Sequence, residues 1–193
     1  MNLVFATNNN NKVKEISEII GDSIKIIGLK DIQCFDDIPE TGKTLEENAL
    51  QKAQYIYNKY GYNAFADDTG LEIDALHGEP GVYTARFAGP ECSPEDNIAK
   101  TLHVLSGVAN RKARFRTVIA CVVDGNEFFF QGYVNGEIAK EVMGEGGFGY
   151  DPIFIPEGYS QSFAQMPMSE KNDISHRGKA TAKFLTFLQG LVS

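Results

Sequence analysis

Apolar and polar segments alternate in the first part of the chain in a way that predicts a strand, a helix and a second strand. Residues 3–6 form a short apolar run, and the polar run 7–11 follows it. The next apolar side chains keep the spacing of one helical face until Gly21, which predicts the end of that helix. These side chains are Val13, Ile16, Ile19 and Ile20. A second apolar run at residues 24–29 predicts another strand.

The residues that follow extend this alternation. The Thr-Leu-Glu-Glu sequence that starts at Thr44 is a capping box, which predicts a helix that runs to about Gly61. Residues 64–67 predict a strand that ends in acids and a turn, and residues 71–74 are expected to continue it. A Ser-Pro-Glu-Asp start predicts a further helix over residues 93–107.

The second half of the chain carries a hairpin pattern. Residues 114–123 and 127–134 are rich in β-branched and aromatic side chains, and they flank an Asp-Gly-Asn turn at residues 124–126. A final helix is predicted over residues 176–191, with an apolar face made by Phe184, Leu185, Leu188 and Leu191. Early alternation and late hairpins together predict an α/β fold with a mixed sheet and two lobes, because a doubly wound fold would alternate throughout.

Length and charge narrow the classes of function. The chain has 193 residues without a repeat, a low-complexity block or a linker, which predicts a single domain over residues 1–193. Its 18 Lys and Arg against 26 Asp and Glu give a net charge of −8. Proteins that bind nucleic-acid polymers or anionic membranes are usually basic, so we expect neither partner.

The cysteines and the N-terminal segment predict a cytoplasmic protein. Cys34, Cys92 and Cys121 are an odd number without CxxC spacing, so neither a disulfide framework nor a zinc site is expected. No basic segment followed by a long apolar run begins the sequence, so no signal peptide is expected. The longest unbroken apolar stretch, residues 118–123, is far shorter than a membrane span.

A polar loop between the first strand and the first helix is a candidate phosphate site. It consists of Thr7, Asn8, Asn9, Asn10, Asn11 and Lys12. Such a loop brings backbone N–H groups and the positive end of a helix dipole to one point, which suits a phosphate. The Thr7 hydroxyl, the Asn9 amide and the Lys12 charge would add donors. A turn in which an Asn caps the helix explains the same residues equally well.

Two adjacent carboxylates are the best candidates for acid–base chemistry. Asp67 and Asp68 lie on an extended segment, where successive side chains point to opposite faces, so the two cannot serve one site equally. An acid beside a glycine turn at the end of a buried strand is well placed to hold a divalent cation and a water. Glu40 could add a second carboxylate, and Mg²⁺ usually takes one or two from the protein. A turn whose acids cap backbone N–H groups is the alternative.

Two further segments are candidates for ligand binding. Lys171 and residues 175–179 place cations at the predicted start of the final helix, where the dipole disfavours them. An anionic or electron-rich ligand would explain them, and a solvated helix start is the alternative. Residues 144–149 match a dinucleotide-binding glycine pattern, but residues 150–152 forbid the helix that this pattern requires. We expect instead a tight loop that presents Phe148 and Tyr150.

A solvated strand face is expected for Arg111, Lys112, Arg114 and Arg116.

Six segments in this order resemble the inosine triphosphate pyrophosphatase family, which hydrolyses non-standard purine nucleoside triphosphates (ITP, dITP, XTP). They are residues 5–9 with 12, residues 40–42 with 47–49 and 52–53, residues 66–71, residues 80–83 with 85–86, residues 146–152, and residues 175–177. Each segment is weak alone, but together they span nearly the whole chain. The resemblance implies two lobes around a long mixed sheet, an active site in the cleft, a homodimer, and the release of a nucleoside monophosphate and pyrophosphate.

The resemblance also assigns roles by matching position. Glu40 and Asp68 would hold Mg²⁺, at least one ion per subunit, and Asp68 would activate the Mg²⁺-bound water that attacks the triphosphate. Phosphate binding would fall to Thr7, Asn8, Asn9, Asn10, Asn11, Lys12 and Lys52. Substrate contacts and the base pocket would come from Thr69, Phe148, Gly149, Tyr150, Asp151, Lys171, His176 and Arg177. Asn8 stands where many members have Gly, which bears on the shape of the loop.

Substrate choice has a physical explanation within this hypothesis. Arg177 could donate to the keto oxygen at C6 of hypoxanthine or xanthine, whereas adenine presents an amino donor there. Phe148 is the candidate for stacking on the base. Two other classes fit the same residues: a hydrolase of pyrimidine or methylated nucleotides, and a nucleotide sensor without catalysis. Pyrophosphate release with and without Mg²⁺ separates the three.

Overall fold

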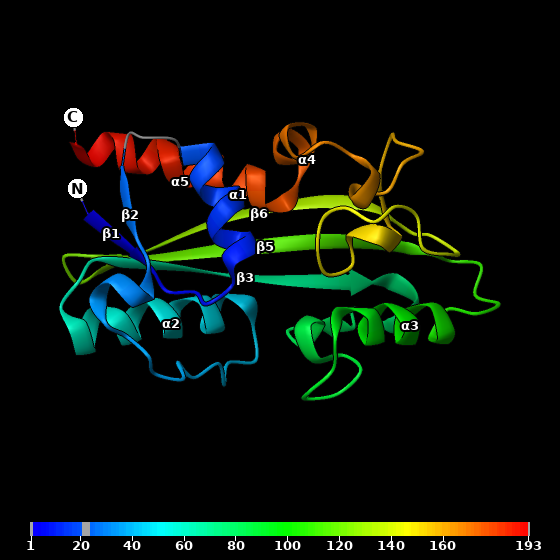
Figure 1. Ribbon diagram of the computed structural model, residues 1–193, viewed down its shortest axis with the longest axis horizontal. Helices are drawn as coiled ribbons and strands as arrows, with labels where there is room; N and C mark the ends of the chain where they lie inside the picture. Colours follow the sequence, from blue (N-terminus) through cyan, green and yellow to red (C-terminus); the bar gives the residue numbers. More distant parts are fainter. Residues whose placement is uncertain (1, 21–23, 193) are drawn as a thin grey trace. The chain divides into compact units, whose positions relative to one another are not determined.

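The computed structural model describes residues 2–20 and 24–192, in which helices and strands alternate early and a long hairpin follows (Figure 1). Within those residues the sheet has seven strands in the order β2-β1-β3-β5-β6-β7, with β4 paired to β3. The β1–β2 and β1–β3 pairs are parallel, whereas the β3–β4 and β6–β7 pairs are antiparallel. The predicted fold class, an α/β protein with a mixed sheet flanked by helices, is confirmed.

The chain divides into two compact units, which we describe separately. Unit 1 comprises Met1–Asp68, Thr117–Gly132 and His176–Ser193, and unit 2 comprises Thr69–Arg116 and Tyr133–Ser175. Three strands contribute residues to both units: β3 (Ala64–Ile73), β5 (Lys112–Val123) and β6 (Asn126–Ile138).

The other elements of unit 1 begin and end at recognisable local signals. They are β1 (Asn2–Phe5), α1 (Asn10–Ile20), β2 (Lys25–Ile27), a 3₁₀ turn (Leu29–Ile32), α2 (Leu45–Tyr60) and α5 (His176–Val192). At the start of α2 the Thr44 hydroxyl accepts a hydrogen bond from the Glu47 N–H at 3.1 Å. The helix ends at Gly61, whose φ of 74° is left-handed backbone that favours glycine.

Side chains on the strands of unit 1 alternate between two apolar layers. One layer joins Leu3, Phe5 and Phe65 to Ile16 of α1 and Phe184 of α5. The other joins Val4, Ala64 and Ala66 to Ala53 and Ile56 of α2. Figure 1 shows α1 and α5 over one face of these strands and α2 over the other. Consecutive residues of β3 therefore face different helices, as the period of two in a strand requires.

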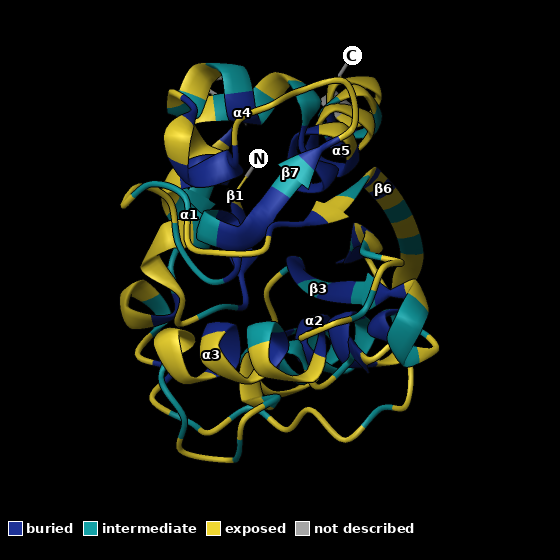
Figure 2. Ribbon diagram, turned by 90° about the vertical axis from the view of Figure 1, so that its right-hand side faces the viewer, coloured by how far each residue is buried: buried dark blue, intermediate teal, exposed yellow. Residues whose placement is uncertain are grey.

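The apolar core of unit 2 contains several phenylalanine rings that pack against one another. Its own elements are β4 (Pro80–Gly81), α3 (Pro94–Val104), β7 (Phe154–Pro156) and α4 (Met168–Ile174), with 3₁₀ turns at Asp74–Leu76, Thr84–Arg86, Asp151–Ile153 and Phe163–Gln165. The Phe115 and Phe154 ring centroids are 4.6 Å apart, and Phe163 lies 5.2 Å from Phe154. In Figure 2 the burial colours alternate along α3, as expected of a helix with one buried face.

Most elements agree with the sequence-based predictions, and the differences have physical reasons. The four predicted helices are confirmed as α1, α2, α3 and α5, and the hairpin turns at Asp124 and Gly125, both with positive φ. The predicted turn after Asp67 is wrong, because β3 continues without interruption to Ile73. The second strand is shorter than predicted, and α4 was not expected. Gly21 lies outside the described residues. Among the helices within them, none is both long and apolar enough to cross a membrane.

Candidate functional site

Seven charged side chains of unit 1 form what we call the ionic cluster. They are Lys12 and Glu15 on α1, Glu40 in the loop before α2, Lys52 on α2, Asp67 and Asp68 on β3, and Arg177 on α5. Four of them are carboxylates and three are cations, so the formal charge of the cluster is −1 (3 − 4). The alternation of β3 divides the cluster between the two faces of the strands.

Asp67 is the centre of the α1 and α5 side. Lys12 Nζ lies 3.1 Å from Asp67 Oδ1, and Arg177 Nε lies 3.3 Å from Asp67 Oδ2. Arg177 also forms an ion pair with the buried carboxylate of Glu15. Two carboxylates thus account for a guanidinium at the start of α5, where the helix dipole disfavours it. The alternative of a solvated helix start is wrong for Arg177, which is buried, and ligand binding by its guanidinium stays a prediction.

Lys52 connects the two faces. Its ammonium donates to the Asp67 carbonyl oxygen at 2.7 Å and forms an ion pair with Glu40. The carboxylate of Asp68 attracts the same ammonium and accepts a hydrogen bond from the amide of Asn48. On the α2 side the carboxylate of Asp68 therefore lies near a second carboxylate (Glu40), an ammonium (Lys52) and an amide (Asn48).

The two adjacent aspartates have opposite pKa shifts. Burial alone would raise the pKa of Asp67, but the charges of Lys12, Arg177 and Lys52 outweigh it and lower that pKa to about 2. Burial raises the pKa of Asp68, and the repulsion from Glu40 adds to it, while Lys52 opposes. Asp67 is thus held as a carboxylate, and Asp68 binds a proton more readily than an ordinary aspartate does.

The cations respond to the same neighbours. Burial lowers the pKa of Lys12 despite the attraction of Asp67. Burial also acts to lower the pKa of Lys52, but Asp68, Glu40 and Asp67 outweigh it and raise that pKa. Lys52 is therefore a firmly held ammonium beside two carboxylates of the α2 side.

The α2 side has the donor set that Mg²⁺ prefers. The charge of Glu40 adds to the cost of ionising Asp68, which a divalent cation would relieve. In the parts of the chain that the structure describes, no group of three or more His, Cys, Asp or Glu side chains could hold a metal ion. Two carboxylates still fit Mg²⁺, which completes its octahedron with waters and substrate phosphates. The residues present therefore fit this cation better than one that needs a cage made entirely of protein groups.

The loop before α1 forms the turn that was the alternative to a phosphate site. Asn9 Oδ1 accepts hydrogen bonds from the N–H groups of Asn11 at 3.0 Å and Lys12 at 3.4 Å, so Asn9 caps α1. The Thr7 hydroxyl accepts from the Asn9 N–H at 3.1 Å. Asn8, Asn10 and Asn11 are exposed. Phosphate binding by this loop stays a prediction, and the cap leaves its exposed amides facing solvent.

Unit 2 brings together three predicted residues and one that was not predicted, Phe163. We call this set the aromatic cluster: Phe148, Asp151, Phe163 and Lys171. Lys171 Nζ lies 2.7 Å from Asp151 Oδ2, and the same oxygen accepts from the Phe148 N–H at 2.9 Å. The ammonium also lies 4.7 Å from the Phe148 ring centroid. The charge of Lys171 is therefore neutralised by Asp151 and shared with an aromatic face.

Gly147 makes this arrangement possible. Its φ is +69°, and a Cβ at this position would lie 2.2 Å from Asp151 Oδ2. The predicted tight backbone path at the glycine loop is thus present. The prediction that the loop presents Tyr150 is wrong, because this ring is buried and its hydroxyl donates to the Thr84 carbonyl at 2.6 Å. Phe148 is half-buried, and Gly149 follows it with a φ of +59°.

The remaining predicted residues lie on the elements that carry the two clusters. Thr69 follows Asp68 on β3 and is half-buried. His176 begins α5, next to Arg177 of the ionic cluster, and is buried. A Cβ on Gly132 of β6 would lie 2.3 Å from the His176 carbonyl oxygen, so the start of α5 rests directly on the strand. Lys171, His176 and Arg177, expected to act together, thus belong to different units.

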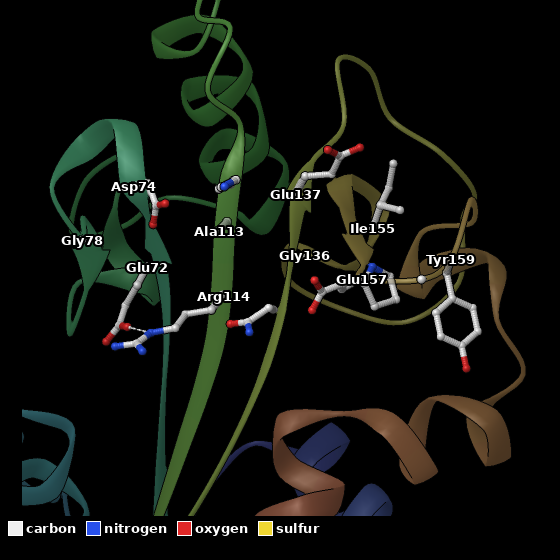
Figure 3. Close-up of a pocket in the computed structure, with 14 residues that line it drawn as sticks. Glu72, Asp74, Gly78, Ala113, Arg114, Gly136, Glu137, Ile155, Glu157 and Tyr159 are labelled. Atoms are coloured by element: carbon white, nitrogen blue, oxygen red, sulfur yellow. Dashed lines mark hydrogen bonds and ion pairs between the residues drawn. The ribbon is translucent and has the colours of Figure 1, made fainter.

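A separate pocket of about 730 Å³ lies in unit 2, beside strands β3, β5, β6 and β7 (Figure 3). None of the predicted site residues lines it. Arg114 forms an ion pair with Glu72 there and is half-exposed, as expected of a solvated strand face. The same expectation is wrong for Arg111, which donates to the carbonyl oxygens of Leu105, Ile138 and Ala139. Its guanidinium thus connects two segments of the backbone within this unit.

Sequence reasoning assigned no role to Glu15 of the ionic cluster or to Asn48, which contacts Asp68. Glu15 looks like any acid on the polar face of an amphipathic helix, and its partner Arg177 is 162 positions away. No local signal could have paired them. Asn48 did have a signal, because it lies within the segment 47–49 that carries the resemblance.

Comparison with known proteins gives relatives over nearly the full chain. A profile of the Ham1 family matches residues 3–187. The chain is 51% identical over 188 residues to a dITP/XTP pyrophosphatase of Flavobacterium johnsoniae, covering 97% of this chain and 98% of that protein. It is also 51% identical to a dITP/XTP pyrophosphatase of Porphyromonas gingivalis, with 96% of each chain covered.

Solved structures agree with these sequence relatives. The Ham1 protein of Staphylococcus aureus has a TM-score of 0.90 and 40% identity, with 99% of this chain and 100% of that chain covered. A nucleoside-triphosphatase / dITP/XTP pyrophosphatase of Mycobacterium abscessus has a TM-score of 0.78 and 37% identity, with 96% and 99% covered. The family resemblance inferred from the sequence is thereby confirmed. The chain belongs to the Ham1 family.

Proposed function

We propose that this protein hydrolyses deaminated purine nucleoside triphosphates (ITP, dITP and XTP) to the nucleoside monophosphate and pyrophosphate. The names of its curated relatives, dITP/XTP pyrophosphatase, support this substrate class. The observation that carries the proposal is the opposite state of two neighbouring aspartates, one neutralised by cations and the other with a raised pKa beside Glu40 and Lys52. Pairs of acids with separated pKa values are typical of acid–base catalysis.

Asp68 is the general base of the proposed reaction. It removes a proton from a water whose oxygen attacks the α-phosphorus, and the bond from that phosphorus to the bridging oxygen breaks. Pyrophosphate leaves with the electron pair of that bond. The raised pKa supports this role, because a carboxylate with a higher pKa is a stronger base than an ordinary one.

Glu40 and Asp68 are the proposed ligands of Mg²⁺. When bound, the ion would supply positive charge that stabilises the charge developing on the phosphate oxygens. The net charge of −1 on the ionic cluster supports a cation there. Lys12 and Lys52, with the exposed amides of Asn8, Asn10 and Asn11, are the proposed contacts for the remaining phosphate charge.

Base recognition is assigned to the aromatic cluster and to the other residues to which the resemblance gives substrate contacts. Phe148 offers a half-buried ring for stacking, and Lys171 and Asp151 offer a donor and an acceptor that hold each other in position. Thr69, Gly149, Tyr150 and His176 stay predicted substrate contacts, with Tyr150 acting through its backbone because its hydroxyl is engaged. Arg177 stays the predicted donor to the C6 keto oxygen, held in orientation by Asp67 and Glu15.

A panel of nucleoside triphosphates tests the proposal. We expect pyrophosphate release from ITP, dITP and XTP in the presence of Mg²⁺, little from ATP or GTP, and none after chelation of the metal. Preferential hydrolysis of pyrimidine or methylated nucleotides would assign the protein to a related hydrolase class. Binding without turnover would make it a sensor.

The dimer that the resemblance implies and the location that the cysteines and the N-terminal segment predict belong to the same proposal. The two units act as one pyrophosphatase domain, in a homodimer located in the cytoplasm, with no nucleic-acid or membrane partner. Light scattering after gel filtration measures the dimer directly. A monomer that turns over at the full rate would contradict it.

A further inference from the structure

The backbone that follows Glu40 is held by a row of side chains on α2. The Thr41 N–H donates to Gln51 Oε1 at 2.9 Å, the Gly42 N–H donates to Asn48 Oδ1 at 2.7 Å, and the Lys43 N–H donates to Glu47 Oε2 at 2.6 Å. Three consecutive amides thus have acceptors on one helix. These three hydrogen bonds fix the loop that carries Glu40.

Asn48 differs from the other two acceptors in where its second polar group points. It is 2% exposed, and its amide donates to the carboxylate of Asp68 while its oxygen accepts from Gly42. An amide side chain carries both an acceptor and donors, so it can hold a backbone N–H with one end and a carboxylate with the other. Glu47 has no donor when ionised, and the amide of Gln51 donates to the Thr41 hydroxyl instead.

Gly42 allows the loop to come close enough for this bridge. A Cβ there would lie 2.6 Å from the Glu47 Cβ and 2.8 Å from Asn48 Oδ1. Any larger residue would have to push the loop away from α2. The backbone after Glu40 and the carboxylate of Asp68 are therefore separated by a single side chain.

We propose that Asn48 is a positioning residue that sets the separation of the Glu40 and Asp68 carboxylates by tying the Glu40 loop to Asp68. This inference rests on the proposed function, in which those two carboxylates hold the cation. Without the bridge, Glu40 keeps its ion pair with Lys52, but the loop and β3 lose their direct link. Loss of the bridge therefore lowers cation affinity and turnover, and it leaves nucleotide affinity nearly unchanged.

Matched variants separate this role from simple loop anchoring. Asn48→Ala removes one loop hydrogen bond and the link to Asp68, whereas Gln51→Ala removes the hydrogen bonds of Gln51 to the N–H and the hydroxyl of Thr41 without touching Asp68. Groups that orient metal ligands contribute about 10- to 100-fold in affinity or activity. We expect Asn48→Ala to weaken Mn²⁺ binding, measured by calorimetry without nucleotide, and to lower kcat, each by about that factor. KM for dITP should stay within about threefold, and Gln51→Ala should change all three by less than about threefold.

A double variant shows whether Asn48 acts through Asp68. In an Asp68→Asn background the further change Asn48→Ala should leave Mn²⁺ affinity nearly unchanged, because the group that it positions is gone. If Asn48→Ala does not fold, Asn48→Ser replaces it, since its hydroxyl is too short to reach both partners.

The outcomes distinguish the inference from the proposed function. A wild-type protein without pyrophosphatase activity would overturn the proposed function itself. An active wild type in which Asn48→Ala and Gln51→Ala behave alike would overturn only the role of Asn48. An active wild type without measurable Mn²⁺ binding would also overturn it, because no pre-set pair of carboxylates would then exist.

Discussion

The ionic cluster of unit 1 and the aromatic cluster of unit 2 solve the burial of charge in different ways. The first packs four carboxylates against three cations and keeps an excess negative charge, whereas the second buries a single ion pair, Lys171 with Asp151, against aromatic rings. A cluster with many charges responds strongly to any charge that enters or leaves. A neutral pair beside a ring favours a flat, uncharged group. This difference indicates that the ionic cluster suits phosphate chemistry and that the aromatic cluster suits a nucleobase.

The largest effect should come from Asp68. Asp68→Asn removes the proposed base and one cation ligand, and general-base catalysis contributes about 10²- to 10⁴-fold, so we expect kcat for dITP to fall by about 10³-fold or more. Because burial raises the pKa of Asp68, its ionised form is less favourable in the folded protein than in the unfolded chain, and the neutral Asn should leave Tm unchanged or raise it. Pyrophosphate release and thermal unfolding measure the two effects.

Asp67 should show the reverse pattern, mainly in stability. Asp67→Asn leaves Arg177 and Lys12 with a neutral neighbour, and breaking a buried ion pair typically costs about 3–5 kcal/mol. In a chain of this length each kcal/mol lowers Tm by about 2–4 °C, so a drop of at least about 6 °C is expected. Activity should fall less than in Asp68→Asn. Equal losses of kcat from both variants would contradict the division of β3 into two faces.

The pH dependence of unfolding sharpens this second prediction. The pKa of Asp67 is about 2 in the folded protein against an ordinary 3.8, so its ionised form stabilises the fold above pH 3.8 and that contribution is lost as the pH falls through about 2. The gap in unfolding free energy between wild type and Asp67→Asn should therefore shrink by about 2 kcal/mol between pH 4 and pH 2. A gap independent of pH would show that charge is not the cause.

The sequence predicted those parts of the two clusters that depend on local signals. A capping Thr44 and a left-handed Gly61 bound α2 because each satisfies its own end of the helix. The strand β3 was interrupted in the prediction because Asp-Asp-Thr-Gly is typical of a turn. In the structure β1 pairs with Ala64 and Phe65, ahead of the two aspartates, and β5 is the other neighbour of β3 in the sheet. The place of β3 inside the sheet outweighs the weak strand propensity of these residues.

Long-range pairs limited the prediction of the site. Alternation along β3 was enough to separate Asp67 from Asp68. It could not show that Arg177 would be neutralised by Glu15, because nothing local relates two side chains so distant in sequence. The burial of Tyr150 was missed for a similar reason, since its partner is the backbone of Thr84, 66 residues earlier.

A smaller effect is expected in the aromatic cluster. Phe148→Leu removes a half-buried ring, and stacking of an aromatic side chain on a base contributes about 1–3 kcal/mol, so KM for dITP should rise about tenfold with little change in kcat. Steady-state kinetics with dITP measures the effect. Phe163→Leu is the matched control, because its ring also lies near Lys171 but is fully buried. It should lower Tm while KM stays unchanged. A rise in KM only for Phe163→Leu would contradict the assignment of Phe148.

The smallest effects compare the two units through their helix caps. Thr44 caps α2 in unit 1 and Ser93 caps α3 in unit 2, each accepting a hydrogen bond at 3.1 Å from the N–H three residues later. Replacement of either by Ala should cost about 1 kcal/mol, or roughly 2–4 °C in Tm. Ser93→Ala should leave kcat unchanged, because α3 carries none of the ionic cluster. Differential scanning calorimetry measures both shifts.

The same pair of variants tests whether the units unfold together. Three strands pass from one unit into the other, so neither unit can unfold completely without disrupting strands that the other contains. We therefore expect a single transition that both substitutions shift by similar amounts. Two transitions, with Thr44→Ala lowering one and Ser93→Ala the other, would mean that unit 1 and unit 2 unfold independently. The contrast between the clusters would then be a contrast between two separately folding parts, and Asp67→Asn should lower only the transition of unit 1.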